Sequence, residues 1–163
     1  VRVATWNVGN APPPSRLEAW LGPDAGADLI AVGAQECTYR SGHGVPDREH
    51  WVAVVATPLE ARGYELVAQE HFWQMRLLVF VRHHLRPWLS NVETSRCGTG
   101  LGDTLGNKGA VGCALQLHDT TVAFVAAHLD AFQNNLAARN DDFQHLVDAV
   151  GGVSLGNPLL DLT

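Results

Sequence analysis

Basic residues are few in this sequence, and no basic run is present. Among its 163 residues, eleven Lys and Arg stand against seventeen Asp and Glu, which gives a formal net charge of −6. Proteins that bind a nucleic-acid backbone usually carry a basic stripe, so the composition weighs against nucleic acid as a partner. It also weighs against purely electrostatic docking to an anionic membrane.

Long apolar runs and cysteine are also scarce. Apolar runs such as Leu77 to Val81 are far too short to span a bilayer, so no transmembrane segment is expected. The three cysteines form neither a CxxC pair nor a disulfide framework, which favours a reducing, cytoplasmic location. The sequence shows no signal peptide and begins with Val1 rather than Met, so we expect a piece of a longer protein.

What the sequence does contain is the patterning of a mixed α/β domain. Strands rich in β-branched residues are predicted at Arg2–Val8, as a buried strand, and at Asp28–Ala34. Ser15 and Glu18 match a capping box, which predicts a short helix ending at Leu21. The other expected elements are a helix over 48–62, strands over 64–71, 76–82, 87–96, 110–118 and 121–128, and an amphipathic helix over 134–150 whose apolar face includes Leu136, Phe143 and Leu146.

Two polar residues stand at the ends of the first two strands. Glu36 follows an apolar strand, and a carboxylate at a strand end is a good oxygen ligand for Mg²⁺. Asn7 ends the first strand, where its amide oxygen could orient Glu36 or contact the water shell of a metal. Taken singly, Glu36 is better explained as a solvated carboxylate at a strand end, and Asn7 as a turn residue beside Gly9.

A glycine-rich loop and a histidine supply two further candidates. In Gly106-Asn107-Lys108-Gly109, glycines would let backbone N–H groups approach an anion while the lysine adds a positive charge. The loop lacks the Gly-Lys-Ser/Thr of a Walker A motif and the following helix of a dinucleotide fingerprint. His128 ends an apolar strand and could donate to a phosphoryl oxygen. The alternatives are an exposed hairpin lysine and a half-buried structural histidine.

In combination, these segments resemble the catalytic domain of the inositol polyphosphate 5-phosphatases, within the endonuclease/exonuclease/phosphatase superfamily. The resemblance covers about residues 1–150, and its most specific part is the Gly-Asn-Lys-Gly-Ala-Val segment, which separates 5-phosphatases from nucleases of the same fold. The segments that carry it are Thr5-Trp6-Asn7-Val8-Gly9, Asp28-Leu29-Ile30 through Gln35-Glu36, Met75 to Val81, Gly106 to Val111, and Phe124 to Leu129 followed by Arg139-Asn140 and Asp142.

The resemblance implies a four-layer α/β sandwich that removes the 5-phosphate from phosphoinositide lipids or soluble inositol polyphosphates with Mg²⁺. It also implies peripheral contact with the membrane that holds the lipid. By the same resemblance, Glu36 would bind the metal with Asn7 beside it, and His128 would contact the scissile phosphate. Asn107 and Lys108 would lie on the substrate side.

Two departures from the family pattern set further expectations. Asp130-Ala131-Phe132 stands where the family has small residues and Gly, and a carboxylate there would repel phosphate. The Trp-x-Gly-Asp-x-Asn and Ser-Asp-His motifs of the family are absent, so residues 1–163 are expected to form the N-terminal part of an incomplete sandwich with little activity alone. A non-catalytic inositol-phosphate or lipid-binding remnant, or a nuclease of the superfamily, are the alternatives.

Overall fold

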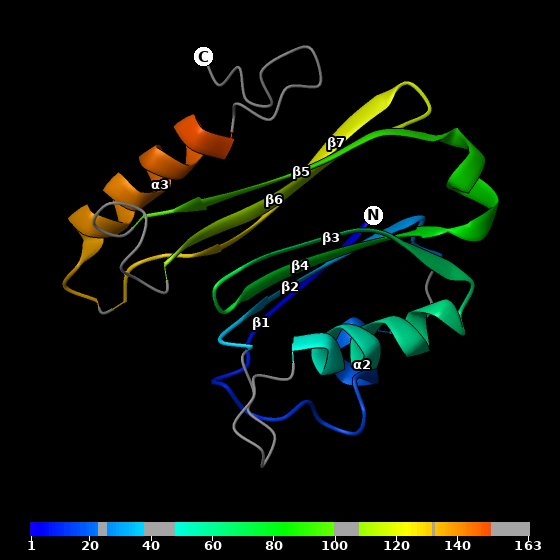
Figure 1. Cartoon of the computed structure of the whole chain (residues 1–163), viewed down its shortest axis with the longest axis horizontal. Helices are drawn as coiled ribbons and strands as arrows, with labels where there is room; N and C mark the ends of the chain where they lie inside the picture. Colours follow the sequence, from blue (N-terminus) through cyan, green and yellow to red (C-terminus); the bar gives the residue numbers. More distant parts are fainter. Residues whose placement is uncertain (23–25, 38–47, 100–107, 132, 151–163) are drawn as a thin grey trace.

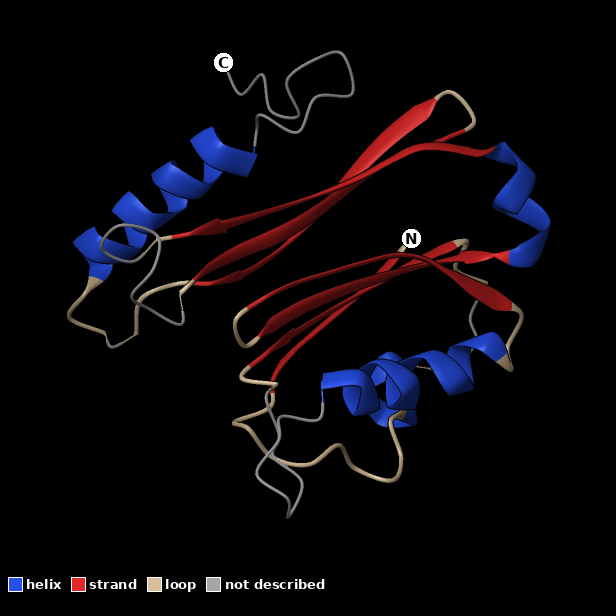
Figure 2. Cartoon of the chain, viewed as in Figure 1, coloured by secondary structure: helices blue, strands red, loops and turns tan. Residues whose placement is uncertain are grey.

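The computed structural model describes residues 1–22, 26–37, 48–99, 108–131 and 133–150. Two β-sheets lie face to face, with α1 and α2 outside one sheet and α3 outside the other (Figures 1 and 2), so the expected four-layer α/β sandwich is confirmed. The elements are β1 (Arg2–Asn7), α1 (Glu18–Leu21), β2 (Leu29–Gln35), α2 (Arg48–Glu60), β3 (Tyr64–Phe72), β4 (Met75–Arg82), the 3-10 helix η1 (His83–Trp88), β5 (Leu89–Gly98), β6 (Gly109–Leu117), β7 (Thr120–His128) and α3 (Leu136–Val150).

The first sheet has the strand order β1-β2-β4-β3, and the second has the order β5-β6-β7. Strand β1 runs parallel to β2, whereas all the other pairs are antiparallel. All of β2 and most of β4 are buried, because helices cover one face of these strands and the second sheet covers the other. Their continuous apolar sequences are typical of strands buried on both faces.

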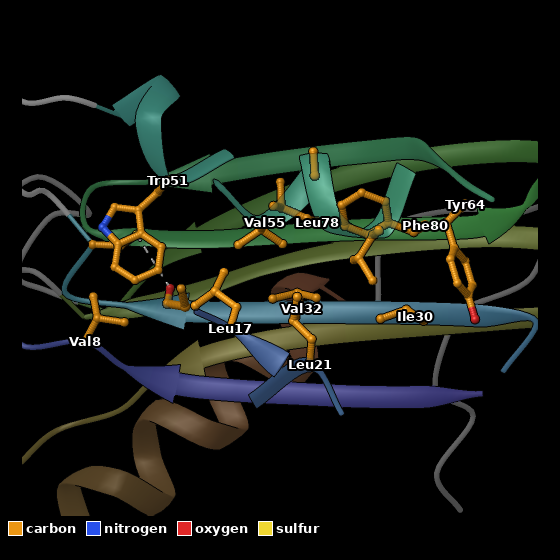
Figure 3. Close-up of a cluster of buried hydrophobic side chains, with 14 of the residues drawn as sticks. Val8, Leu17, Leu21, Ile30, Val32, Trp51, Val55, Tyr64, Leu78 and Phe80 are labelled. Atoms are coloured by element: carbon orange, nitrogen blue, oxygen red, sulfur yellow. Dashed lines mark hydrogen bonds between the residues drawn. The ribbon is translucent and has the colours of Figure 1, made fainter. Parts of the chain in front are cut away.

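Two apolar cores hold the layers together. The first lies between the β1-β2-β4-β3 sheet and the helices, where Trp51 and Val55 of α2 share one buried cluster with Phe80 of β4 (Figure 3). The second lies between the two sheets and includes Val79, Val111 and Leu115 among its fully buried side chains. Burying one large apolar side chain contributes about 1.5–3 kcal/mol, so these two cores account for most of the cohesion between layers.

Strand β1 is not the buried strand that its sequence predicts. Within the described residues it has a neighbour on one side only, and Val3 and Trp6 are 67% and 40% exposed. Strand β7 is likewise at an edge, and its Val125 is 51% exposed. A groove of about 240 Å³ lies between these two edges, lined mainly by apolar side chains of both sheets. The sequence correctly identified a strand here but could not show its place in the sheet.

Two local expectations also fail. The first helix begins at Glu18, after Leu17, and no side chain caps it, so the capping box based on Ser15 is not formed. Leu17 is 5% exposed, and its burial in the first core fixes the start of the helix in place of the serine hydroxyl. Pro87, expected within a strand, belongs to the 3-10 helix η1 instead, because proline cannot donate a backbone hydrogen bond to a ladder.

Helix α3 has the expected extent but not the expected burial. Leu146 is buried against Ala110 of β6, whereas Leu136 and Phe143 are 61% and 58% exposed. No helix in the described part of the chain is long and apolar enough to cross a membrane.

Candidate active site

The ends of four segments meet at one end of the two sheets. Strands β1 and β2 are parallel, with Asn7 opposite Gln35, so their carboxyl ends lie at the same edge. In the second sheet, Gly109 pairs with His128, which brings the start of β6 beside the end of β7. Gly33 permits the close approach of the two sheets, since a Cβ there would lie 3.0 Å from the Cβ of Ala126.

Asn7 and Glu36 are in direct contact, as the sequence predicted. The Asn7 Nδ2 group donates a 2.9 Å hydrogen bond to Glu36 Oε1. The Asn7 Oδ1 atom accepts the backbone N–H of Gly9 at 3.0 Å. The amide nitrogen, rather than the expected oxygen, therefore orients the carboxylate, because the oxygen closes the turn that follows β1.

The backbone of Glu36 is held in an unusual conformation. Its φ of 54° lies in the left-handed region, which a glutamate enters only at a cost of about 1–3 kcal/mol. Three backbone hydrogen bonds surround it: Val8 N–H to Gln35 O at 2.9 Å, Asn10 N–H to Glu36 O at 2.6 Å, and Cys37 N–H to Gln74 O at 3.1 Å. These bonds hold the turn, and the Asn7 amide holds one oxygen of the Glu36 carboxylate.

His128 lies between the carboxylate and the lysine. Its Nε2 atom is 3.7 Å from Glu36 Oε1 and 2.7 Å from Lys108 Nζ. An ammonium can only donate, so in this arrangement Nε2 accepts and the ring proton resides on Nδ1. The side chains of His128 and Glu36 are 11% and 30% exposed, which leaves the pair accessible but largely shielded from water.

Lys108 is the only lysine in the sequence. Its backbone carbonyl accepts the N–H of Thr99 at 3.3 Å, which closes the base of the loop between β5 and β6. Gly109 follows with a φ of 150°, and a Cβ at this position would collide with the Cys97 carbonyl. Glycine is therefore required here by the close passage of β5, a reason that the sequence did not indicate, and anion binding by this loop stays a prediction. Asn107 lies outside the described residues.

Asp130 does not place a loose carboxylate beside the site. One of its oxygens accepts the backbone N–H of Ala131 at 2.9 Å, and the other accepts the amide of Asn135 at 2.9 Å. Asp142 in turn accepts the Asp130 backbone N–H at 3.0 Å. These bonds fix the segment that follows His128, and the repulsion of phosphate by Asp130 stays a prediction.

Sequence reasoning overlooked two supporting residues. Gln35 is 8% exposed and donates to Thr5 Oγ1 at 3.2 Å, which ties β1 to β2 one residue before Glu36. Asn135 was also missed, because a polar residue five positions after an aspartate is common and gives no distinctive signal. Asp142 was named only as part of a motif, and the structure gives it a bonding role.

The donor set suits a hard cation that keeps several water ligands. No group of three or more His, Cys, Asp or Glu residues that could enclose a metal occurs within the described ranges. Mg²⁺ is commonly bound by one or two carboxylates together with waters and substrate phosphates. Among the described residues at this site, the Glu36 carboxylate is a ligand of the kind that Mg²⁺ prefers, and a metal here stays a prediction.

Comparison with known proteins places this geometry in a family. The sequence model of endonuclease/exonuclease/phosphatase family 2 matches residues 4–155, and the chain belongs to this family. The chain is similar to phosphatidylinositol 3,4,5-trisphosphate 5-phosphatase 2B of Danio rerio, with 36% identity over 90% of the chain and 13% of that protein. It is 32% identical to the human phosphatidylinositol 3,4,5-trisphosphate 5-phosphatase 2 over 99% of the chain and 13% of that protein.

Solved structures share the same architecture. The inositol polyphosphate 5-phosphatase domain of a synaptojanin, in complex with inositol (1,4)-bisphosphate and a calcium ion, matches with a TM-score of 0.80 and 27% identity. That match covers 98% of this chain and 48% of the synaptojanin chain, so this chain spans about half of the solved domain. A Cimex nitrophorin also shares the fold, with a TM-score of 0.63 and 20% identity, which shows that the fold alone does not fix an activity.

Proposed function

We propose that the protein to which this chain belongs is a Mg²⁺-dependent phosphatase that removes the 5-phosphate from phosphoinositide lipids or soluble inositol polyphosphates. The observation that carries the proposal is the convergence of Glu36, His128 and Lys108 at one end of the sheets, where His128 is within ion-pairing distance of Glu36 and within hydrogen-bonding distance of Lys108. The names of the relatives and the ligand of the synaptojanin domain support the same substrate class.

Each residue has a role that follows from its contacts. Asn7 holds the Glu36 carboxylate in the orientation required of a metal ligand. Lys108 presents hydrogen-bond donors and positive charge to phosphoryl oxygens, and His128 would donate from Nε2 in its other tautomer once a phosphate replaces it as the partner of Lys108. Asn107, the neighbour of Lys108 in the sequence, is assigned to the substrate by the resemblance alone. Mg²⁺, when bound, would polarise a phosphoryl oxygen and stabilise the charge that develops on it.

The proposal includes a dependence on residues outside this chain. Phosphoryl transfer needs a positioned water molecule as well as a metal and charge stabilisation. The described residues provide one carboxylate at the site, and the chain spans about half of the solved domain that it resembles. We therefore expect little phosphate release from residues 1–163 alone. The free thiols Cys37, Cys97 and Cys113 support a reducing, cytoplasmic setting, with peripheral membrane contact through the lipid substrate.

Substitution of Glu36 tests the metal role. In the full-length protein, Glu36→Gln should lower the rate of phosphate release from phosphatidylinositol 3,4,5-trisphosphate by about a hundredfold or more, because the metal supplies several kcal/mol of charge stabilisation. Asn7→Ala should lower it by about 10–100-fold, as is usual when the residue that orients a ligand is lost. Chelation of divalent metal should abolish activity, and added Mg²⁺ should restore it.

Glu60→Gln is the matched control, because it removes an exposed carboxylate from the end of α2. It should leave the rate unchanged. Full activity of Glu36→Gln with Mg²⁺ would contradict the assignment of Glu36, and robust turnover by residues 1–163 alone would contradict the expected dependence on further residues.

A non-catalytic binding role is the second candidate. It is favoured by the contact between Lys108 and His128, which places two groups suited to phosphate side by side without a metal. Binding of an inositol polyphosphate that is insensitive to chelation and to Glu36→Ala, without phosphate release, would support this role over the phosphatase.

A further inference from the structure

The end of strand β1 carries Asn7, although this strand lies at an edge of its sheet. Within the described residues, β2 is the only strand that pairs with β1, and Val3 is 67% exposed. An edge strand has a ladder of hydrogen bonds on one side only, so its end opens more easily than that of a central strand. The 2.9 Å contact between Asn7 and Glu36 therefore depends on support for β1 from outside the sheet.

Trp20 of the short helix α1 supplies such support. Its indole N–H donates to the backbone carbonyl of Thr5 at 3.2 Å. The ring of Trp6 lies edge-on to the ring of Trp20, with centroids 5.4 Å apart, and also edge-on to the ring of Trp51, at 6.4 Å. Thr5 and Trp6 directly precede Asn7, so both contacts of Trp20 act on the last residues of the strand.

Helix α1 holds Trp20 in a fixed position. Leu17, directly before the helix, is 5% exposed, and Leu21 at its end is 0% exposed, so both ends of α1 are anchored in the first core. The Arg62 guanidinium donates to the carbonyl of Gly22 at 3.0 Å, which ties the end of α1 to the segment that follows α2. An indole carried by so short a helix is therefore still well placed to fix a neighbouring strand.

Thr5 connects this support to the second strand of the site. Its carbonyl accepts the N–H of Trp20, and its Oγ1 atom accepts the side-chain amide of Gln35 at 3.2 Å. Gln35 directly precedes Glu36, and Thr5 lies on the same face of β1 as Asn7, because alternate residues of a strand face the same side. Thr5 is thus held by α1 and by β2 at once.

We propose that Trp20 is a positioning residue that keeps Asn7 in contact with the Glu36 carboxylate and so prepares Glu36 to bind the metal. This inference rests on the proposed function and names a residue outside the site on which that function depends. Asn7 acts on Glu36 directly, whereas Trp20 acts through Asn7 by holding the end of β1. Loss of the indole should therefore weaken metal binding, although Trp20 touches neither the carboxylate nor the substrate.

The experiment measures Mg²⁺ binding to the full-length protein by isothermal titration calorimetry, without substrate. Trp20→Phe keeps an aromatic ring beside Trp6 and removes the N–H that donates to Thr5. We expect Trp20→Phe to weaken Mg²⁺ binding about three- to tenfold, which is less than the roughly 10–100-fold loss usual when a residue that orients a ligand directly is removed. Mg²⁺ binding equal to that of the wild type would overturn the proposal.

Trp88→Phe is the matched control for the loss of an indole. Trp88 is 57% exposed, and its ring stacks on His118 at 4.7 Å. Strand β6 runs from Gly109, at the site, to Leu117, beside His118, so this pair lies at the opposite end of the strands. Trp88→Phe should bind Mg²⁺ as the wild type does, and an equal loss in this variant would overturn the assignment to Trp20.

A double variant decides whether Trp20 acts through Asn7. Asn7→Ala alone should weaken Mg²⁺ binding about 10–100-fold. Adding Trp20→Phe to it should cost less than about a further twofold, because residues that act through one shared contact do not have additive effects. If the two losses multiplied, Trp20 would act independently of Asn7 and the proposal would be wrong.

A role in folding alone gives a different pattern. Trp20→Phe would then lower the midpoint of urea unfolding and leave Mg²⁺ affinity unchanged, which would overturn the proposal. We expect instead that phosphate release from a soluble inositol polyphosphate needs more Mg²⁺ to reach half its maximal rate. The rate at saturating Mg²⁺ should stay within about twofold of the wild type, because the excess metal compensates for weaker binding.

Failure of the proposed function is distinguishable from failure of this inference. If the full-length wild type bound no Mg²⁺ and released no phosphate, the phosphatase proposal would fail. Hydrogen exchange would still test the support of β1, since backbone amides over residues 2–8 should exchange faster in Trp20→Phe than in the wild type or in Trp88→Phe. Equal exchange in the three proteins would overturn the role given to Trp20.

Discussion

The two helical layers of this molecule are packed to very different degrees. On α2, Trp51 and Leu59 are 2% and 0% exposed, and both lie in the first core. On α3, Leu146 is buried, but Phe143 on the same helix is 58% exposed. Both helices carry enough apolar residues to bury a face, so the difference arises from what surrounds them. An apolar helix face predicts that another secondary-structure element packs against it. It does not indicate whether that element lies within these 163 residues or elsewhere in the protein.

The edges of the sheets repeat this contrast. The central strands β2 and β4 have neighbours on both sides, whereas β1 and β7 have one neighbour each within the described residues. Their open edges adjoin the groove that exposes Val3 and Val125. Because the chain spans about half of the solved 5-phosphatase domain, we expect further strands of the whole protein to pair here.

The largest expected effect is a difference in stability between a variant of α2 and a variant of α3. Trp51→Ala should lower the free energy of unfolding by about 3–5 kcal/mol, because it removes a large buried ring and leaves a cavity in the first core. Phe143→Ala should change it by less than about 0.5 kcal/mol, as expected for an exposed side chain. Urea denaturation of the chain measures both. A loss of similar size in the two variants would show that α3 is packed as tightly as α2.

A smaller expected effect is the pH dependence of stability that arises from Cys113, which lies in the core between the two sheets. Burial raises the pKa of the Cys113 thiol from its ordinary 9.0 to about 11. Below pH 9.0 the thiol is protonated in the folded and the unfolded chain, so stability is unaffected. Between these two values the unfolded chain loses its proton first, and stability therefore falls as the pH rises through about 11.

Unfolding followed from neutral to alkaline pH checks this expectation. Cys113→Ala should show a shallower alkaline decline than the wild type, since it removes this one thiol. Identical pH profiles for the two proteins would show that the thiol is not shielded from water and that the two sheets pack loosely.

The smallest effect requires no substitution. Backbone amides of α2 should exchange with deuterium more slowly than those of α3, because local opening of α3 uncovers less apolar surface. Hydrogen exchange of the chain, resolved by peptide, gives the comparison. Equal protection of both helices would contradict the contrast drawn from Leu59 and Phe143.

Much of the site could be predicted because it lies at strand ends. Asn7, Glu36 and His128 each follow a run of apolar residues whose strand character is set by local composition. Lys108 lies between Gly106 and Gly109 in the sequence, in a segment that resembles a specific segment of the family. The strands themselves were located to within about two residues, a margin that is usual for element boundaries.

Other features depended on contacts between distant residues. The exposure of β1 follows from its place at an edge, which no pattern in residues 2–8 reveals. The start of α1 is set by burial of Leu17 rather than by Ser15. The hydrogen bond between Asn135 and Asp130 joins two common polar residues, so only the folded chain singles it out.

Local sequence by itself determined the strands, the helices and the kinds of side chain that stand at their ends, because apolar periodicity and backbone preference act over a few residues. The tertiary structure alone decided that Glu36, His128 and Lys108 lie next to one another in a row. Their contact requires the two sheets to pack closely at Gly33 and Ala126. It also decided which apolar faces are covered, because burial depends on neighbours that are remote in the chain.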